Sequence, residues 1–176
     1  KYAVDYRKTV MGDDFSCCRL IFGEADGLPG LTVDRFSDIL VAQVLSFGMD
    51  KIKDIIYTSL IKILRDFGEE INGLYERNDV AIRELEGLEQ YKGWYEAIPH
   101  PESAVTEICE NGIKYLVDVE NGQKTGFFLD QKYNRLAISK IAKGKKVLDC
   151  FTHTGSFALN AAMGGAQHVT AVDVSK

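Results

Sequence analysis

The sequence has few cysteines, prolines, histidines and tryptophans. Its 176 residues include four cysteines, three prolines, three histidines and one tryptophan. The cysteines form no Cys-x-x-Cys pair, so neither a disulfide framework nor a cysteine-based zinc site is predicted, and a reducing compartment is indicated. His100, His153 and His168 stand in three separate sequence contexts, so we predict no metal site.

Long hydrophobic runs and a basic excess are also missing. No apolar run approaches the roughly 20 residues of a membrane-spanning helix, and residues 1–10 lack the apolar core of a signal peptide. The chain has 21 Lys and Arg residues against 26 Asp and Glu residues, which argues against it being the main nucleic-acid-binding part of a protein. With 45% hydrophobic residues the chain can bury a core, so we expect a soluble, cytoplasmic, globular protein without membrane contact.

Apolar periodicity and turn residues divide the chain into short elements. We predict strands at 17–22, 31–36, 39–47, 71–76, 105–110, 113–119, 146–150 and 168–174. We predict helices at 1–10, 50–67, 80–85, 129–141 and 155–163. Asp50 and Asp130 are predicted N-caps, and Asn111-Gly112 is a strong hairpin signal. The pattern weakens over 91–101, which indicates a linker, so we expect a β-rich α+β domain at 1–102 and a second domain at 103–176.

The end of the sequence reads as strand, glycine turn, helix and strand within about 30 residues. This is a βαβ unit, whose two strands run parallel, and it predicts an α/β sheet. Ligands of such sheets bind at the first strand–helix turn, here 149–156. Gly155 is the only glycine in that turn and no lysine follows it, so dinucleotide and phosphate-loop sites are both excluded.

A nucleoside ligand without phosphates remains. Asp173 follows Gly155 by 18 residues, about the spacing at which an acidic residue meets ribose hydroxyls. Asp149 ends the first strand and can face the polar head of the same ligand. S-adenosylmethionine (SAM) fits, because it carries a ribose and a cationic methionine end. The motif alone leaves open a generic βαβ unit in which Ser156 caps the helix and Asp173 is solvated.

Four separated motifs then resemble one family. Residues 149–159 resemble motif I of class I SAM-dependent methyltransferases. Residues 122–131, followed by Asn134-Arg135, resemble the element before motif I in the large-subunit ribosomal RNA methyltransferases that form 5-methylcytosine. Residues 22–35 and 75–79 resemble the central β-rich domain of that family. The resemblance covers nearly the whole chain and implies a SAM-dependent rRNA methyltransferase.

The resemblance also implies a domain order. Family members carry an RNA-binding PUA domain, a central β-rich domain and a complete Rossmann-like methyltransferase domain. This chain would hold the α+β central domain and the start of the Rossmann-like sheet, so rRNA contact would lie mainly in domains absent here. The catalytic cysteine is expected beyond Lys176, so the segment alone is expected to be inactive. Cys150 is interpreted as an apolar filler at the end of a buried strand.

By resemblance, Asp173 would hold the ribose and Asp149 the methionine end, with loop residues and two aromatics around them. The predicted cofactor-binding residues are Phe127, Phe128, Asp149, Phe151, Thr154, Gly155, Ser156 and Asp173. Lys124 and Arg135 stay open as site residues, and both phenylalanines have an alternative role as core aromatics. The basic run Lys140, Lys143, Lys145 and Lys146 is either a solvated helix end or an RNA-phosphate contact.

Two alternatives to this function stay open. The chain would be a non-catalytic binding or scaffold module with the same fold, or part of a family member that methylates another base. A homodimer is a further option for the assembly.

Overall fold

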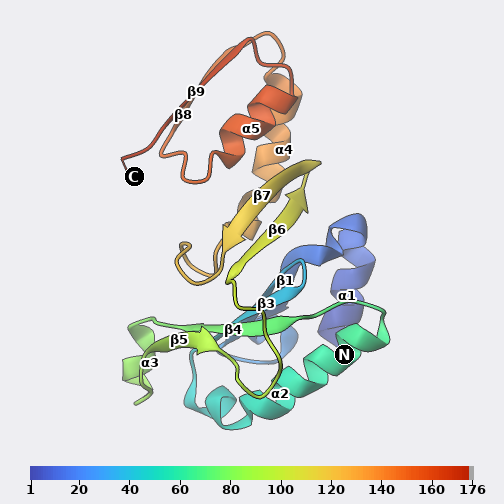
Figure 1. Cartoon of the computed structure of the whole chain (residues 1–176), viewed down its shortest axis with the longest axis vertical. Coiled ribbons are helices and arrows are strands. Elements are labelled where there is room, and N and C mark those ends of the chain that lie inside the picture. Colours follow the sequence, from blue (N-terminus) through green and yellow to red (C-terminus); the bar gives the residue numbers. More distant parts are fainter. Residues whose placement is uncertain (175–176) are drawn as a thin grey trace. The chain divides into compact units, whose positions relative to one another are not determined.

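The computed structural model describes residues 1–174, which divide into two compact units. The first unit comprises Lys1–Ile108 and Lys114–Phe127, and the second comprises Cys109–Ile113 and the chain from Phe128 onward (Figure 1). Helices and strands mix in both units, so the predicted α/β class is confirmed. The predicted domain boundary at residue 102 stays a prediction. No helix among the described residues combines the length and apolar character needed to cross a membrane.

A five-stranded sheet forms the frame of the first unit. Its order is β1-β2-β3-β4-β5, with β3 and β4 parallel and every other neighbouring pair antiparallel. The strands are β1 (Cys17–Phe22), β2 (Leu31–Phe36), β3 (Ile39–Val44), β4 (Gly73–Asn78) and β5 (Tyr91–Trp94). Helix α2 (Phe47–Asp66) joins β3 to β4, because a parallel pair needs a crossover connection.

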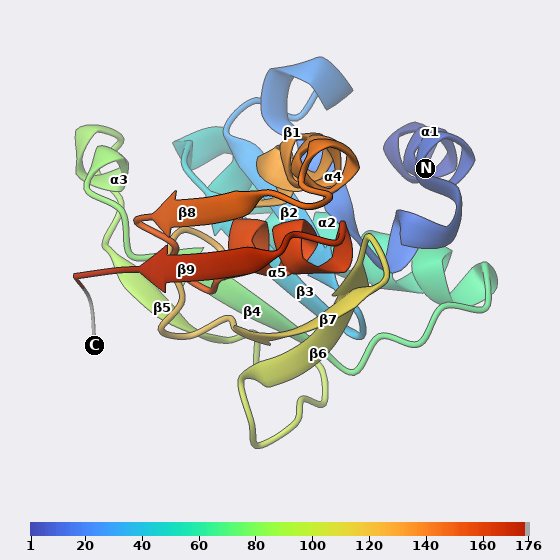
Figure 2. The ribbon, with the colours of Figure 1, turned by 90° about the horizontal axis from the view of Figure 1, so that it is seen from above.

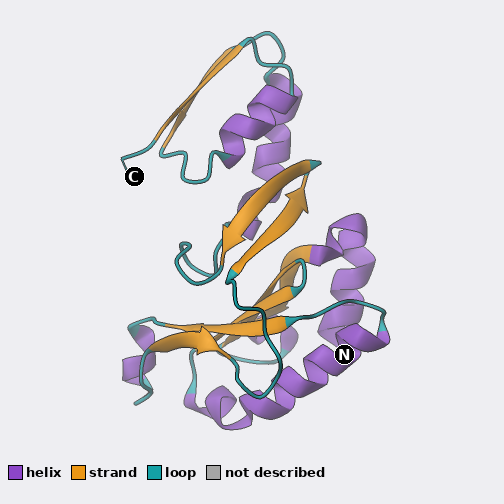
Figure 3. Cartoon of the chain, in the orientation of Figure 1, coloured by secondary structure: helices purple, strands orange, loops and turns teal. Residues whose placement is uncertain are grey.

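Two helices supply the apolar core on one face of this sheet. The core combines Val4 of α1 (Tyr2–Met11), Leu60 and Leu64 of α2, and strand residues such as Val33 and Leu40. Figure 3 shows both helices beside the strands of this unit. Short helical turns complete it: η1 (Gly12–Ser16), η2 (Gly23–Asp26) and α3 (Ile82–Leu85).

Two sequence predictions for the first unit were wrong. Ser46, not Asp50, caps α2: its backbone is extended and its hydroxyl accepts from the Met49 N–H, so the helix begins before Asp50. The predicted linker at 91–101 contains β5, which pairs with β4. A strand of four residues is too short for its alternation to be recognised in a sequence.

The opposite face of the sheet carries a buried carboxylate. Asp34 lies between Val33 and Arg35 on β2, so alternation points it away from the helical core. It accepts two hydrogen bonds from Arg19, at 2.7 and 3.0 Å, and one from the Thr125 hydroxyl, at 2.7 Å. The charge is therefore paired, and it ties residue 125 to the sheet.

Arg77 of β4 holds the same irregular segment. Its Nη1 donates to the carbonyls of Val119 (3.0 Å) and Gly122 (2.8 Å), while its other nitrogens pair with Asp79. Loop carbonyls have no strand partner, and buried ones need a donor. Arg77 supplies that donor, so the loop at 119–126 has a fixed backbone.

A β-hairpin contributes to both units. It consists of β6 (Val105–Glu110) and β7 (Ile113–Asp118), as predicted. Asn111 and Gly112 have φ values of 54° and 77°, which is the conformation that a type I′ turn requires. Buried and exposed residues alternate along both strands.

The second unit contains the predicted βαβ element. Strands β8 (Lys146–Cys150) and β9 (His168–Val172) pair in parallel, joined by α5 (Ser156–Met163) (Figure 2). Before them stand η3 (Leu129–Gln131) and α4 (Lys132–Ile141). Helix α5 packs against α4 and against both strands.

Three predictions for this unit were wrong. Asp130 does not cap the helix: α4 begins after Gln131 and has no side-chain cap. β8 is not a buried strand, because no element among residues 1–174 covers the face that carries Leu148 and Cys150. Cys150 is therefore exposed and does not fill a core.

The close packing of α4 and α5 generates a prediction. A Cβ added at Gly164 would lie 2.1 Å from the backbone oxygen of Ser139, which cannot move aside. We expect Gly164→Ala to lower the free energy of unfolding by about 1–3 kcal/mol. Gly48→Ala is the matched control, because nothing lies within 4 Å of its added Cβ. Thermal unfolding followed by circular dichroism checks both; equal midpoints for Gly164→Ala and wild type would contradict the packing.

Candidate cofactor-binding site

The turn between β8 and α5 has an unusual backbone. Phe151, His153 and Gly155 have φ values of 59°, 52° and 72°, so three alternate residues are left-handed. Left-handed backbone costs about 1–2 kcal/mol for a residue with a side chain, and such strain concentrates at functional sites. Gly155 bears this conformation without that cost and stands at the N-cap of α5.

Asp149 fixes the turn from the end of β8. Its Oδ2 accepts from the Thr152 hydroxyl at 2.5 Å and from the Ala158 N–H, in the first turn of α5, at 3.0 Å. The carboxylate therefore caps the helix, where its negative charge also suits the helix dipole. Ser156, the predicted alternative cap, is the first residue of α5 and is buried, and Gly155 holds the N-cap position.

Asp173 reaches the same turn from the end of β9. Its Oδ2 accepts from the His153 N–H at 2.8 Å. The register pairs Cys150 with Val172, so the carboxyl ends of the two strands lie at one edge. Asp149 and Asp173 are thus both anchored to the loop at 151–158.

Aromatic side chains differ in their surroundings. Phe128 packs edge-on against His153, with ring centroids 5.5 Å apart and planes at 86°. Phe151 is 81% exposed, and Thr154 is exposed as well. Phe127 belongs to the first unit, where it is buried against Tyr115 at 5.2 Å.

The structure thus gathers seven of the eight predicted cofactor residues in the second unit. Phe127 is the exception, and its surroundings match the alternative role as a core aromatic. The sequence analysis missed Thr152 and His153. The Thr152 hydroxyl donates to Asp149, and the His153 N–H donates to Asp173. Thr152 follows Asp149 by three residues, a spacing typical of side-chain turns, and could have been found.

No group of three histidine, cysteine or acidic residues within 1–174 is arranged to hold a metal ion. Cys17 and Cys18 are buried in β1, whereas Cys109 and Cys150 are exposed.

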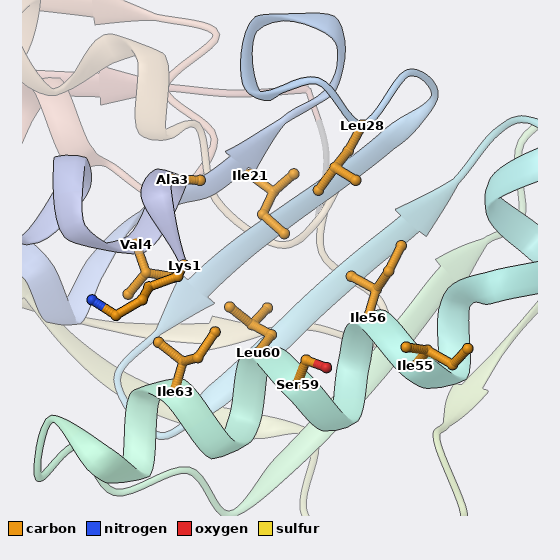
Figure 4. Close-up of a pocket in the computed structure, with 10 residues that line it drawn as sticks. All are labelled: Lys1, Ala3, Val4, Ile21, Leu28, Ile55, Ile56, Ser59, Leu60 and Ile63. Atoms are coloured by element: carbon orange, nitrogen blue, oxygen red, sulfur yellow. The ribbon is translucent and has the colours of Figure 1, made fainter.

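An apolar groove and a polar pocket lie within the first unit. An apolar groove of about 180 Å³ lies between α1 and α2, lined by residues such as Val4, Ile21 and Leu60 (Figure 4). A polar hollow of about 440 Å³ includes Lys53 and Glu76. Burial alone would lower the pKa of Lys53, but its hydrogen bonds with Tyr91 and Glu76 outweigh burial and raise it.

Residues 93–176 match the family model for S-adenosylmethionine-dependent methyltransferases, so SAM is confirmed as the cofactor of the matched family. The chain is 46% identical, over 164 residues, to ribosomal RNA large subunit methyltransferase I of Aliivibrio fischeri. It is 44% identical over 163 residues to the Escherichia coli protein of the same name. This chain resembles large-subunit rRNA methyltransferases over 93% of its length. It spans about 40% of the length of these curated relatives.

Solved structures agree on the fold. A Streptococcus mutans protein, provisionally described as a SAM-dependent methyltransferase, is 28% identical with a TM-score of 0.79, covering 99% of this chain and 43% of that one. SMU.776, provisionally described as a methyltransferase and complexed with SAH, is 29% identical with a TM-score of 0.80, at the same coverage. The M. jannaschii tRNA m1G37 methyltransferase is 20% identical and has a TM-score of 0.58, covering 82% of this chain and 41% of that one. At that identity the likeness shows the fold alone.

The cap geometry predicts the behaviour of Asp149 variants. Asp149→Ala removes the acceptor of the Ala158 N–H, so we expect a loss of about 1–2 kcal/mol in the free energy of unfolding. Asp149→Asn keeps a cap oxygen and should lose less. Urea titration checks both variants. An alanine variant as stable as the asparagine variant would show that the carboxylate does not cap α5.

Proposed function

We propose that the second unit binds SAM at the carboxyl edge of β8 and β9, as part of an enzyme that methylates large-subunit ribosomal RNA. One observation carries the proposal: Asp149 and Asp173 are both anchored to a single strained loop, in the segment that matches the methyltransferase model.

The chemistry of this edge suits SAM and disfavours nucleotides with phosphates. Two carboxylates at one edge repel a phosphate, and the loop has only Gly155 for close backbone approach. SAM has no phosphate, carries positive charge at its sulfonium and amino groups, and offers ribose hydroxyls as donors. Carboxylates accept from such donors and attract such charge.

Five of the predicted cofactor residues then receive a proposed role. Asp173 would hold the ribose, Asp149 would face the methionine end, and the exposed Phe151 and Thr154 would line the loop. Phe128 would add apolar surface. The set proposed for cofactor binding is Phe128, Asp149, Phe151, Thr154, Gly155, Ser156 and Asp173, all in the second unit, and it leaves out Phe127, a buried residue of the first unit. Bound SAM supplies an electrophilic methyl group, and these residues bind and orient it, which is how binding geometry contributes to rate.

The finer assignment concerns the target and the rest of the protein. We propose cytosine C5 of large-subunit rRNA as the target, with RNA held mainly by a PUA domain and with the catalytic cysteine outside this chain. Neither Cys109 nor Cys150 is given a catalytic role. The cytoplasm, where ribosomal RNA is modified, is the proposed location, and a homodimer stays an open option.

Calorimetric titration of SAM into the protein tests the ribose role of Asp173. We expect Asp173→Ala to weaken binding roughly tenfold or more, because a charged hydrogen bond contributes about 1.5–3 kcal/mol. Asp130→Ala is the matched control, since Asp130 is an exposed acid that accepts only from the neighbouring Gln131 side chain. An unchanged dissociation constant for Asp173→Ala would remove the ribose role. No binding by the wild type would favour the scaffold alternative.

Nucleoside analysis of the product tests the target. Incubation of the longer protein, which would carry the proposed PUA domain and catalytic cysteine, with large-subunit rRNA and SAM should give 5-methylcytosine, detected by mass spectrometry of the nucleosides. Another methylated base would refute the C5 assignment but keep the methyltransferase. An absence of methylation despite SAM binding would favour the scaffold alternative.

A further inference from the structure

A fully buried ion pair stands at the tip of the hairpin in the second unit. Glu110 and Arg135 are each 1% exposed. Arg135 donates two hydrogen bonds to the Glu110 carboxylate, from Nε to Oε1 at 2.6 Å and from Nη2 to Oε2 at 2.8 Å. An apolar pair of similar volume is often as stable as a buried ion pair, or more so. Stability alone is therefore a weak reason for charge at this place.

Arg135 also makes a bond that an apolar residue could not make. Its Nη2 donates to the backbone oxygen of Phe128 at 2.8 Å. A guanidinium is planar and rigid, so one side chain holds the carboxylate and the carbonyl in a fixed relation. Glu110 thereby orients Arg135, and Arg135 orients Phe128.

Phe128 leads from this pair to the candidate site. Its ring lies edge-on against His153, and the His153 N–H donates to Asp173. A continuous series of contacts therefore runs from Glu110 to the acid proposed to hold the ribose. Every member of the series belongs to the second unit.

The hairpin turn contacts this unit at a second point. The Asn111 amide donates to the Lys132 carbonyl of α4 at 3.1 Å and to Oδ1 of Asn160 in α5 at 3.4 Å. Asn160 in turn donates to the Ser156 carbonyl, at the start of α5. The hairpin tip thus holds α4 and α5, and α5 begins directly after the cofactor loop.

We propose that Glu110 and Arg135 are positioning residues for the cofactor site, acting through Phe128 and His153. The inference rests on the proposed function, because it assigns the pair to SAM binding. Neither residue contacts the proposed ligand. Their role is to fix the loop before SAM arrives, which lowers the cost of ordering it upon binding.

The test compares the buried pair between β6 and α4 with an exposed pair between β6 and β7. The double variant Glu110→Leu/Arg135→Met replaces the buried pair with apolar residues. The control Glu107→Leu/Lys114→Met replaces an exposed pair whose charges lie 2.8 Å apart. Each is measured by thermal unfolding, by calorimetry with SAM, and by the ring ¹H–¹³C resonances of His153, which are assigned with His153→Gln.

We expect the buried-pair variant to keep an unfolding midpoint near that of the wild type, to bind SAM roughly five- to tenfold more weakly, and to shift the His153 resonances. The control should change neither affinity nor resonances. Wild-type affinity and unshifted His153 resonances in the buried-pair variant would overturn the proposal.

A second variant keeps the test decisive if the buried-pair double variant does not fold. Arg135→Lys keeps the charge opposite Glu110 but cannot hold the carboxylate and the Phe128 carbonyl in one plane. It should bind SAM more weakly than the wild type, and equal affinity with unshifted His153 resonances would overturn the proposal. If the wild type bound no SAM, the proposed function would fail by itself. The His153 resonances would then still decide whether the pair positions the loop.

Discussion

A charged side chain that leaves water needs a partner, and this requirement organises both units. In the first unit Asp34 is fully buried, and its carboxylate is shared between Arg19 and the Thr125 hydroxyl. In the second, Arg135 donates two hydrogen bonds to the buried Glu110 carboxylate. Removing one member of such a pair leaves an uncompensated charge, so each pair fixes the segments that it joins. Side-chain pairs of this kind hold the irregular segments that they join, as backbone hydrogen bonds hold the strands.

The candidate site is formed by a loop whose backbone is held in place by side-chain hydrogen bonds. Around Phe151–Gly155 the backbone adopts left-handed conformations that a free loop would avoid, and Asp149 and Asp173 hold it there. The two acids therefore serve the loop before they serve any ligand. A site built in this way is preorganised, which favours tight placement of a small cofactor over adaptation to many.

Much of the fold could be predicted from the sequence, because apolar periodicity and turn chemistry are local signals. The hairpin with its Asn111-Gly112 turn and the βαβ unit with Gly155 both follow from such signals. The cap at Ser46 and strand β5 were missed, because a cap shifted by four residues and a strand of four residues leave little pattern in a sequence. For the site, the acids could be predicted from their positions at strand ends. The partners of Arg135 could not, because Glu110 lies 25 residues away and only the folded chain brings them together.

The strict alternation of the hairpin has a consequence for how its sequence can vary. Thr106, Ile108 and Glu110 share one face of β6, opposite the apolar positions of β7. A one-residue slip would invert both strands at once, exposing Ile108 and Glu110 together. An odd-numbered insertion within this hairpin is therefore not compatible with its buried face. Natural drift in length should be confined to even steps or to segments outside β6 and β7.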